Sequence, residues 1–84
     1  MQRVGGKMPY QTNLQLPLPV RKHLPSHAQS IYREAFNQAF AAHVDEVDRE
    51  ARSHRIAWAA VKRAYEKNDG AWIARRQAQQ RLPI

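Results

Sequence analysis

Four histidines and a short run of acids are the side chains of this sequence that could bind a metal ion. His43 and His54 flank residues 45–50, which carry four acids and one base. Imidazole nitrogens and carboxylate oxygens are common ligands of divalent cations, but the run lacks the alternating donors and central glycine of an EF-hand. His23 and His27 are four residues apart, yet a proline between them interrupts the helix that would align their rings. We therefore expect structural or surface roles for the histidines, and neither a metal nor a cofactor.

Residues suited to catalysis lack the context that catalysis needs. The sequence has no cysteine, no Gly-x-Ser-x-Gly elbow and no Gly-rich phosphate-binding loop ending in Lys. Glu34, Asp45 and His43 could in principle act as general acids or bases, but such groups need shifted pKa values inside a concave site. An 84-residue chain leaves little volume for such a site. We predict a protein that is not an enzyme.

Basic side chains are the strongest candidates for binding. The chain carries a net charge of +7, and its positive residues are separated in sequence from the acids of residues 45–50. The candidate basic face consists of Arg52, Arg55, Lys62 and Arg63, with Lys67, Arg75 and Arg76 as its extension. Such a band could neutralise the phosphates of a nucleic acid. It could equally attract an acidic protein surface or anionic lipid, or be only a solvated helix face.

The aromatic residues allow two interpretations as well. A row of aromatic rings could stack nucleic-acid bases, but the helical spacing of these rings predicts that they face inward. We therefore favour core packing for Tyr32, Phe36, Phe40, Trp58 and Tyr65. Trp72 stands close to Arg75 and Arg76 and could form the corner of a binding surface, although here too we favour packing.

Three helices are expected to position these side chains. An apolar residue recurs every three or four positions from Ala28 to Phe40, which predicts an amphipathic helix with Ser26 as N-cap and Gln29 at the third position. Prolines bracket a shorter helix at residues 17–23. A third helix is predicted from about Asp48 to Lys67, ended by the Asn-Asp-Gly sequence that follows.

Length and composition predict one small domain. The absence of cysteine is consistent with a reducing cytoplasm, where we expect the protein to act. The longest apolar stretch without Lys, Arg, Asp or Glu, residues 35–44, is far shorter than the about 20 residues that a membrane-spanning helix needs. Residues 1–7 carry positive charge but no apolar run behind it, so we expect no secretion signal. The composition does not predict an oligomeric state.

Two blocks of the sequence resemble a known family. The first block is Leu-Pro-Ser-His-Ala-Gln followed by Ile-Tyr and Ala-Phe-Asn, and the second follows about twenty residues later. Together the two blocks resemble the ChaB family, and Met8-Pro9-Tyr10 is similar to its usual start. The residues that carry the resemblance are Pro25, Ser26, His27, Ala28, Gln29, Ile31, Tyr32, Ala35, Phe36, Asn37, His54, Ala57, Trp58, Val61, Lys62, Tyr65 and Trp72. We expect these signature residues to be mainly structural.

The resemblance implies a mainly α, small α+β fold. It implies a short helix, two long antiparallel-packed helices, and a minimal two-stranded sheet in which residues 71–74 pair with the segment near Tyr10. It also implies a single domain over residues 8–76, so we expect residues 1–7 to be a disordered extension and residues 77–84 a flexible tail.

The resemblance also implies a function without catalysis. The family name implies regulation of a cation/proton antiporter for sodium or calcium, and hence docking on a transporter or another regulator. Viral relatives have been linked to DNA binding, so a nucleic-acid accessory protein that uses the basic face is the alternative.

Overall fold

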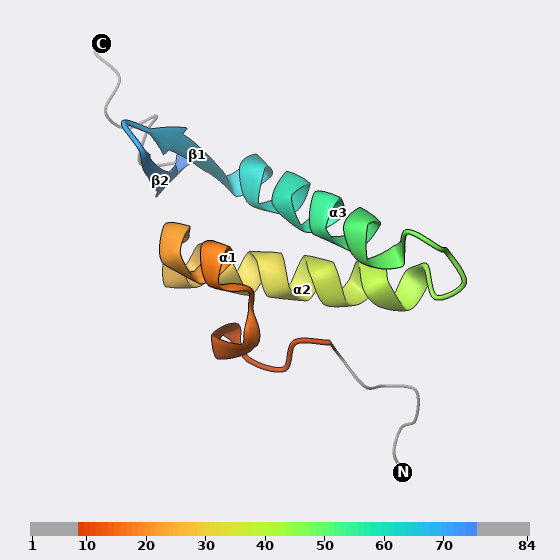
Figure 1. The fold of residues 1–84 in the computed structure, drawn as a ribbon. Coiled ribbons are helices and arrows are strands. Elements are labelled where there is room, and N and C mark those ends of the chain that lie inside the picture. The colour runs from red at the N-terminus through yellow and green to blue at the C-terminus, as the bar shows by residue number, and fades with distance from the viewer. Residues whose placement is uncertain (1–8, 76–84) are drawn as a thin grey trace.

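The fold is an antiparallel pair of long helices with a short helix at one end and a β-hairpin after the second long helix (Figure 1). The computed structural model describes residues 9–75. Its elements, in chain order, are the 3₁₀ turn η1 (Asn13–Gln15), helix α1 (Leu18–His23), helix α2 (Ser26–Ala42), helix α3 (Arg49–Ala64), strand β1 (Tyr65–Asn68) and strand β2 (Ala71–Ala74). The expected extension at residues 1–7 and tail at residues 77–84 lie outside the described residues.

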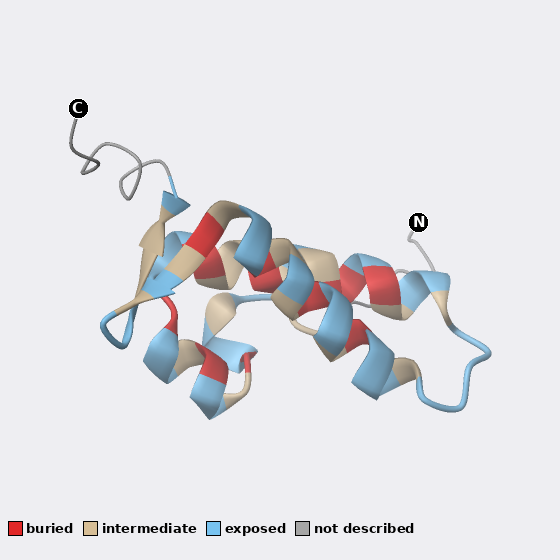
Figure 2. Cartoon of the chain, turned by 90° about the horizontal axis from the view of Figure 1, so that it is seen from above, coloured by how far each residue is buried: buried red, intermediate tan, exposed pale blue. Residues whose placement is uncertain are grey.

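The core lies along the interface of α2 and α3 and is closed at one end by α1 (Figure 2). The apolar spacing predicted for α2 is confirmed, since its facing side is buried and α3 contributes Ala57 and Val61 to the same core. The core residues are Leu16, Val20, Leu24, Ala28, Tyr32, Phe36, Ala57, Val61 and Tyr65. Burial of these side chains is the main source of stability, because each large apolar side chain contributes about 1.5 to 3 kcal/mol when removed from water.

The start of α2 differs from the predicted capping box. Pro25 occupies the N-cap position, Ser26 is already helical, and no side chain caps the helix start. The amide of Gln29 instead donates hydrogen bonds to the backbone oxygens of Leu24 (2.8 Å) and Arg21 (3.3 Å). The last carbonyls of a helix lack partners within that helix. Gln29 therefore satisfies the end of α1 and ties the short helix to the long one.

The predicted pairing of the terminal segments is wrong. Strand β2 pairs antiparallel with β1, with Tyr65 opposite Ala74 and Asn68 opposite Ala71. The connecting residues Asp69 (φ 54°) and Gly70 (φ 84°) both adopt the left-handed conformation, which a two-residue hairpin turn requires. Asp-Gly favours such a turn, so this dipeptide joins two strands instead of ending a longer helix.

The predicted extent of the third helix is wrong for the same reason. Helix α3 ends at Ala64, and Tyr65 is already extended (φ −132°, ψ 155°). Its hydroxyl lies 3.1 Å from Nδ1 of His27 on α2. A tertiary contact and a favourable hairpin turn together outweigh the weak helical preference of this segment.

The segment near Tyr10 is held by a side chain and not by a strand. Asn37 on α2 accepts a hydrogen bond from the backbone N–H of Tyr10 (3.2 Å) and donates one to its backbone oxygen (2.7 Å). The Tyr10 ring packs on Phe36 with ring centroids 4.8 Å apart. One buried amide thus replaces the ladder of backbone bonds that pairing with β2 would have supplied.

Candidate interaction surface

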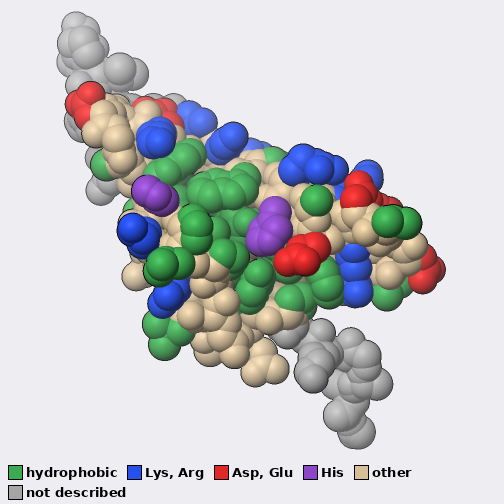
Figure 3. Space-filling model, in the orientation of Figure 1, with side chains coloured by type: hydrophobic (Ala, Val, Ile, Leu, Met, Phe, Trp, Pro, Cys, Tyr) green, Lys and Arg blue, Asp and Glu red, His purple; other side chains and the backbone are tan. Residues whose placement is uncertain are grey.

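The predicted basic residues project from the outer side of α3 and from the hairpin. Arg52, Arg55, Lys62 and Arg63 are all exposed on α3, and Lys and Arg side chains follow this edge of the molecule (Figure 3). Lys67 on β1 and Arg75 after β2 are exposed as well. Arg76 lies outside the described residues.

Acids from the α2–α3 loop fold back onto part of this band. Glu46 lies 3.3 Å from Arg52, and Asp48 lies 3.8 Å from Arg55. The separation of charges seen along the sequence is therefore reduced in space. Such exposed pairs are worth about 0 to 1 kcal/mol, so an incoming anion can displace them at small cost.

The hairpin end of the band is partly neutralised too. Arg75 pairs with Glu66 at 2.9 Å and donates a hydrogen bond to the backbone oxygen of Lys62 (2.8 Å). Within residues 9–75, no acid lies within ion-pair distance of Lys62, Arg63 or Lys67. Among the described residues of this basic band, the least neutralised cations therefore lie at the C-terminal end of α3 and on β1.

Two hollows share residues along α3 and form one continuous surface. The first, of about 470 Å³, is lined by His54, Arg55, Trp58, Ala59 and Lys62. The second, of about 280 Å³, is lined by Arg52, Arg55, Ile56 and Ala59. We call these seven residues the α3 strip. Its charged members are all basic and its centre is apolar, a pattern that suits a binding partner with acidic and apolar side chains.

A third hollow lies where the hairpin meets the start of α2. It measures about 520 Å³ and is lined by Pro25, His27, Ala64, Tyr65, Trp72, Ile73 and Ala74. The contact between the Tyr65 hydroxyl and His27 is its main polar feature. None of its lining residues carries a permanent charge, so this hollow offers less basis for recognising a charged partner than the α3 strip does.

The aromatic rings are used in packing. Tyr32 and Phe36 are each 1% exposed, and Trp58 meets Tyr32 edge-on with centroids 5.2 Å apart. Trp72 is half-buried and lies 5.8 Å from Trp58, centroid to centroid. Packing, which the sequence favoured for these rings, is what the structure shows. They do not form an open platform for stacking bases.

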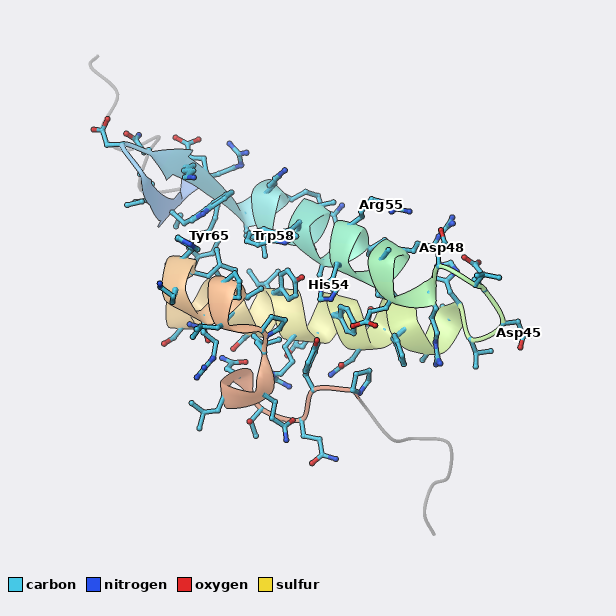
Figure 4. The ribbon with its side chains drawn as sticks, viewed as in Figure 1. Asp45, Asp48, His54, Arg55, Trp58 and Tyr65 are labelled. Atoms are coloured by element: carbon cyan, nitrogen blue, oxygen red, sulfur yellow. The ribbon has the colours of Figure 1, made fainter. Side chains whose placement is uncertain are left out.

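His54 connects the two long helices (Figure 4). Its Nδ1 is hydrogen-bonded to the hydroxyl of Tyr32, and its Nε2 lies 3.9 Å from a carboxylate oxygen of Glu50. Burial lowers the pKa of His54, and the negative charge of Glu50 opposes this effect in part. Burial, with a smaller contribution from Tyr10, raises the pKa of the Tyr32 hydroxyl well above its usual range. The neutral imidazole and neutral phenol are therefore the favoured forms.

The absence of a metal centre remains an expectation. The contacts of the histidine side chains are as follows. His27 contacts Tyr65, and His43 lies 2.8 Å from a carboxylate oxygen of Glu46. Within residues 9–75, no three His, Asp or Glu side chains are grouped so that they could hold a metal ion.

The sequence patterns did not single out Arg49, Ile56 or Ala59, because these residues lie outside the apolar stripe that predicts the core. Arg49 stacks on the Phe40 ring, with its guanidinium carbon 3.6 Å from the ring centroid, and donates a hydrogen bond to the Phe40 backbone oxygen (2.7 Å). Ile56 and Ala59 form an exposed apolar row on α3, opposite the buried Ala57 and Val61. Their spacing of three residues was the available signal for this second stripe.

In the part of the chain that the structure describes, no helix combines the length and the apolar character that crossing a membrane requires. This agrees with the prediction from the short uncharged stretch at residues 35–44.

The fold and the surface define a small helical protein with a basic and apolar face. The family model ChaB matches residues 16–75, and the chain belongs to the ChaB family. The signature residues lie mainly along the contact between α2 and α3, where Tyr32, His54 and Trp58 touch one another. The exposed exceptions are Pro25, Ser26, His27 and Lys62.

Named relatives are closely similar over most of their length. A protein of Escherichia coli (strain K12), named "Putative cation transport regulator ChaB", is 50% identical over 68 residues, which cover 74% of this chain and 90% of the relative. A Shigella flexneri protein of the same name matches equally well. An NMR solution structure with that name aligns with a TM-score of 0.68 and 45% identity, over 79% of this chain and 97% of the other. The relatives are named as regulators and not as enzymes.

Proposed function

We propose that this protein regulates a sodium or calcium/proton antiporter by docking on the transporter or on a protein that controls it. The proposal rests on the ChaB relatives, which are named for cation transport regulation. The observation that carries the docking step is the α3 strip, in which exposed apolar residues lie between cations. Docking would take place on the cytoplasmic side of the membrane.

The structural use of the titratable groups supports a role without catalysis. Burial lowers the pKa of His54, and this residue already serves as a hydrogen-bond partner of Tyr32. The described hollows are open to solvent and have walls built mainly from apolar side chains and cations. We therefore assign this protein a binding task that needs no reacting group.

Cation-driven proton flux tests the proposed function directly. Inverted membrane vesicles that contain a sodium or calcium/proton antiporter would be assayed with a pH-sensitive dye, with and without the full-length protein. We expect the protein to change the initial rate of cation-driven proton movement. An unchanged rate for both sodium and calcium, at protein concentrations that saturate the vesicles, would contradict the proposal.

Binding to nucleic acid is a second candidate, favoured by one observation. Lys62, Arg63 and Lys67 lie beyond ion-pair distance of the described acids, so they are available to phosphates. Labelled duplex DNA would be titrated at about 50 and 200 mM salt, a range over which contacts to many phosphates lose most of their affinity.

A triple variant makes the nucleic-acid test specific. If DNA is the partner, replacing Arg55, Lys62 and Arg63 by Gln should weaken binding to all sequences and reduce its salt dependence. Failure of the wild-type protein to bind at the lower salt would remove this candidate.

A further inference from the structure

We propose that the α3 strip binds an acidic amphipathic helix of a partner protein; this inference rests on the docking function proposed above and names the partner's chemistry. The strip runs from Arg52 to Lys62 along one helix. Ten residues of α-helix rise about 15 Å, so a partner helix lying along the strip would contribute about three turns. This is the length over which an amphipathic helix presents two or three apolar anchors at i, i+3 and i+7.

The shape of the strip suits the ridge of a helix. Ala59 lies in both hollows, and its small side chain leaves a depression between Ile56 and Trp58. A small residue allows a partner side chain to approach the backbone of α3 closely. Ile56 supplies exposed apolar surface beside this depression, and Trp58 forms a rigid wall because its ring is packed on Tyr32 and Trp72.

The charges of the strip call for carboxylates on the flanks of that helix. Arg52, Arg55 and Lys62 edge the apolar centre, and of the described residues that line the two hollows none is acidic. Arg52 and Arg55 form ion pairs with exposed carboxylates of the α2–α3 loop, and carboxylates of the partner can take the place of these. Lys62 forms no ion pair with a described acid, so a partner carboxylate can bind it without displacing another. Complementary charge would fix the orientation of the partner helix and raise the rate of encounter.

Two other classes of partner fit the surface less well. A nucleic acid would place phosphates on the cations but would leave the apolar centre of the strip without a partner unless a base stacked on an open ring, and Trp58 is engaged on both Tyr32 and Trp72. An anionic membrane would need a wide exposed apolar face to enter the lipid, but Ala57 and Val61 are buried in the core and the apolar row of the strip is limited to Ile56, Ala59 and the edge of Trp58. A narrow apolar row between cations is better matched by a helix.

A designed peptide tests this binding without knowledge of the partner. The probe is a fluorescein-labelled peptide of about 18 residues, constrained as a helix, with Leu at i, i+3 and i+7 and Glu on both flanks. Anisotropy of the full-length protein with this peptide should show binding that weakens as salt is raised, whereas the same peptide with Lys in place of Glu should not bind. Binding of both peptides alike, or of neither, overturns the inference. Binding of labelled duplex DNA or of phosphatidylserine vesicles, without binding of the acidic peptide, would also overturn the inference.

Matched variants locate the binding to the strip. Ala59→Glu places bulk and negative charge in the depression and should weaken peptide binding by about tenfold or more. Arg55 and Arg63, each four residues away, can pair with the new carboxylate, so the fold should be preserved. The control, Gln38→Glu, makes the same change of charge at an exposed position on α2 and should leave affinity unchanged. Equal losses in both variants would overturn the inference, and circular dichroism would verify that both remain folded.

A second pair of variants separates local from overall charge. Replacing Arg55 and Lys62 together by Gln should weaken peptide binding about fivefold and reduce its salt dependence. Replacing Lys22 and Lys67 by Gln removes as much charge from outside the strip and should have little effect. An equal effect of the two double variants would mean that only net charge matters, against the proposed site.

The antiport assay distinguishes failure of this inference from failure of the proposed function. If the wild-type protein alters the proton flux and Ala59→Glu alters it equally, the α3 strip is not the docking site, although regulation stands. If the peptide binds wild-type protein and not Ala59→Glu, but the wild-type protein leaves the flux unchanged, the docking surface stands and its target is not the antiporter.

Discussion

The hydrogen bond between Tyr32 and His54 shows how single side chains join the two long helices. The hydroxyl of Tyr32 is hydrogen-bonded to Nδ1 of His54, and the imidazole also packs on the Phe36 ring with centroids 4.6 Å apart. Glu50 faces its other nitrogen from one turn earlier on α3. A charged imidazole would carry protons on both ring nitrogens and could only donate to this hydroxyl, and its charge would lie in partly buried surroundings.

Stability should therefore depend on the protonation of His54. Its pKa in the folded state is lowered from the ordinary value of 6.5, so the unfolded chain binds the proton more readily. The stabilising contribution is complete above 6.5, declines as the pH falls through that value, and is lost below the folded-state pKa. Thermal unfolding across this range should show a smaller acid-induced decrease in Tm for His54→Gln than for the wild-type protein. Equal decreases would contradict the assignment, and His23→Gln, an exposed position, serves as control.

Asn37 is the second residue whose polar side chain determines a long-range contact. It is 8% exposed, and it holds the backbone of Tyr10 from a position 27 residues away. Replacing it with Leu should lower the free energy of unfolding by about 1 to 3 kcal/mol, because the partly buried backbone groups of Tyr10 lose their partners. Urea unfolding would measure the loss. Gln38→Leu, at the exposed neighbouring position, should stay within about 0.5 kcal/mol, and a loss as large there would argue against this role.

At the scale of elements, the hairpin shows how a turn redirects the chain after α3. Gly70 has φ of 84°, and a Cβ at this position would meet no atom within 4 Å. A substitution there is therefore disfavoured by backbone conformation alone and not by crowding. The short strands depend on this turn because they offer few cross-strand pairs of their own.

Changing Gly70 to Ala should lower stability by about 1 kcal/mol, the usual cost of the left-handed conformation for a residue with a Cβ. Asp69→Asn should be nearly neutral, because Asn adopts this conformation readily. Denaturant unfolding of the two variants would check both expectations. A neutral Gly70→Ala would show that the turn does not limit stability, whereas NMR chemical shifts of β1 and β2 would report whether the strands remain paired.

At the scale of the whole molecule, a cluster of rings joins the N-terminal segment and the two long helices into one unit. Phe36 lies at its centre, in contact with the rings of Tyr10, Tyr32, Phe40 and His54. Through these neighbours it links the N-terminal segment, α2 and α3. A small domain with one core should then unfold cooperatively, since no second core could persist alone.

Truncation of Phe36 to Ala should lower the free energy of unfolding by about 3 to 5 kcal/mol, which is a large part of the total stability of a small domain. The variant should be largely unfolded at 37 °C by circular dichroism. Leu14→Ala is the matched control, because Leu14 is 78% exposed and its truncation should change little. Retention of a sharp thermal transition in Phe36→Ala, close to that of the wild-type protein, would contradict the central role of this ring.

Local patterns determined the helical elements of this protein. The apolar spacing from Ala28 to Phe40 predicted α2 and its buried side, and the prolines around residues 17–23 predicted α1. These predictions were reliable because the period of an amphipathic helix and the fixed φ of proline are properties of the local chain. The positive charge of α3 was also evident, since it depends only on residue types.

Only the tertiary structure decided how those elements meet. Residues 71–74 could pair with β1 through a two-residue turn or with the distant segment near Tyr10. They pair with β1, because closing a short loop costs less conformational entropy than closing a long one. The α3 strip likewise exists because α2 covers one side of α3 and leaves the other, with Ile56 and Ala59, exposed. Exposure is a property of the packed molecule, so helical spacing alone could not distinguish the exposed side of α3 from a second buried one.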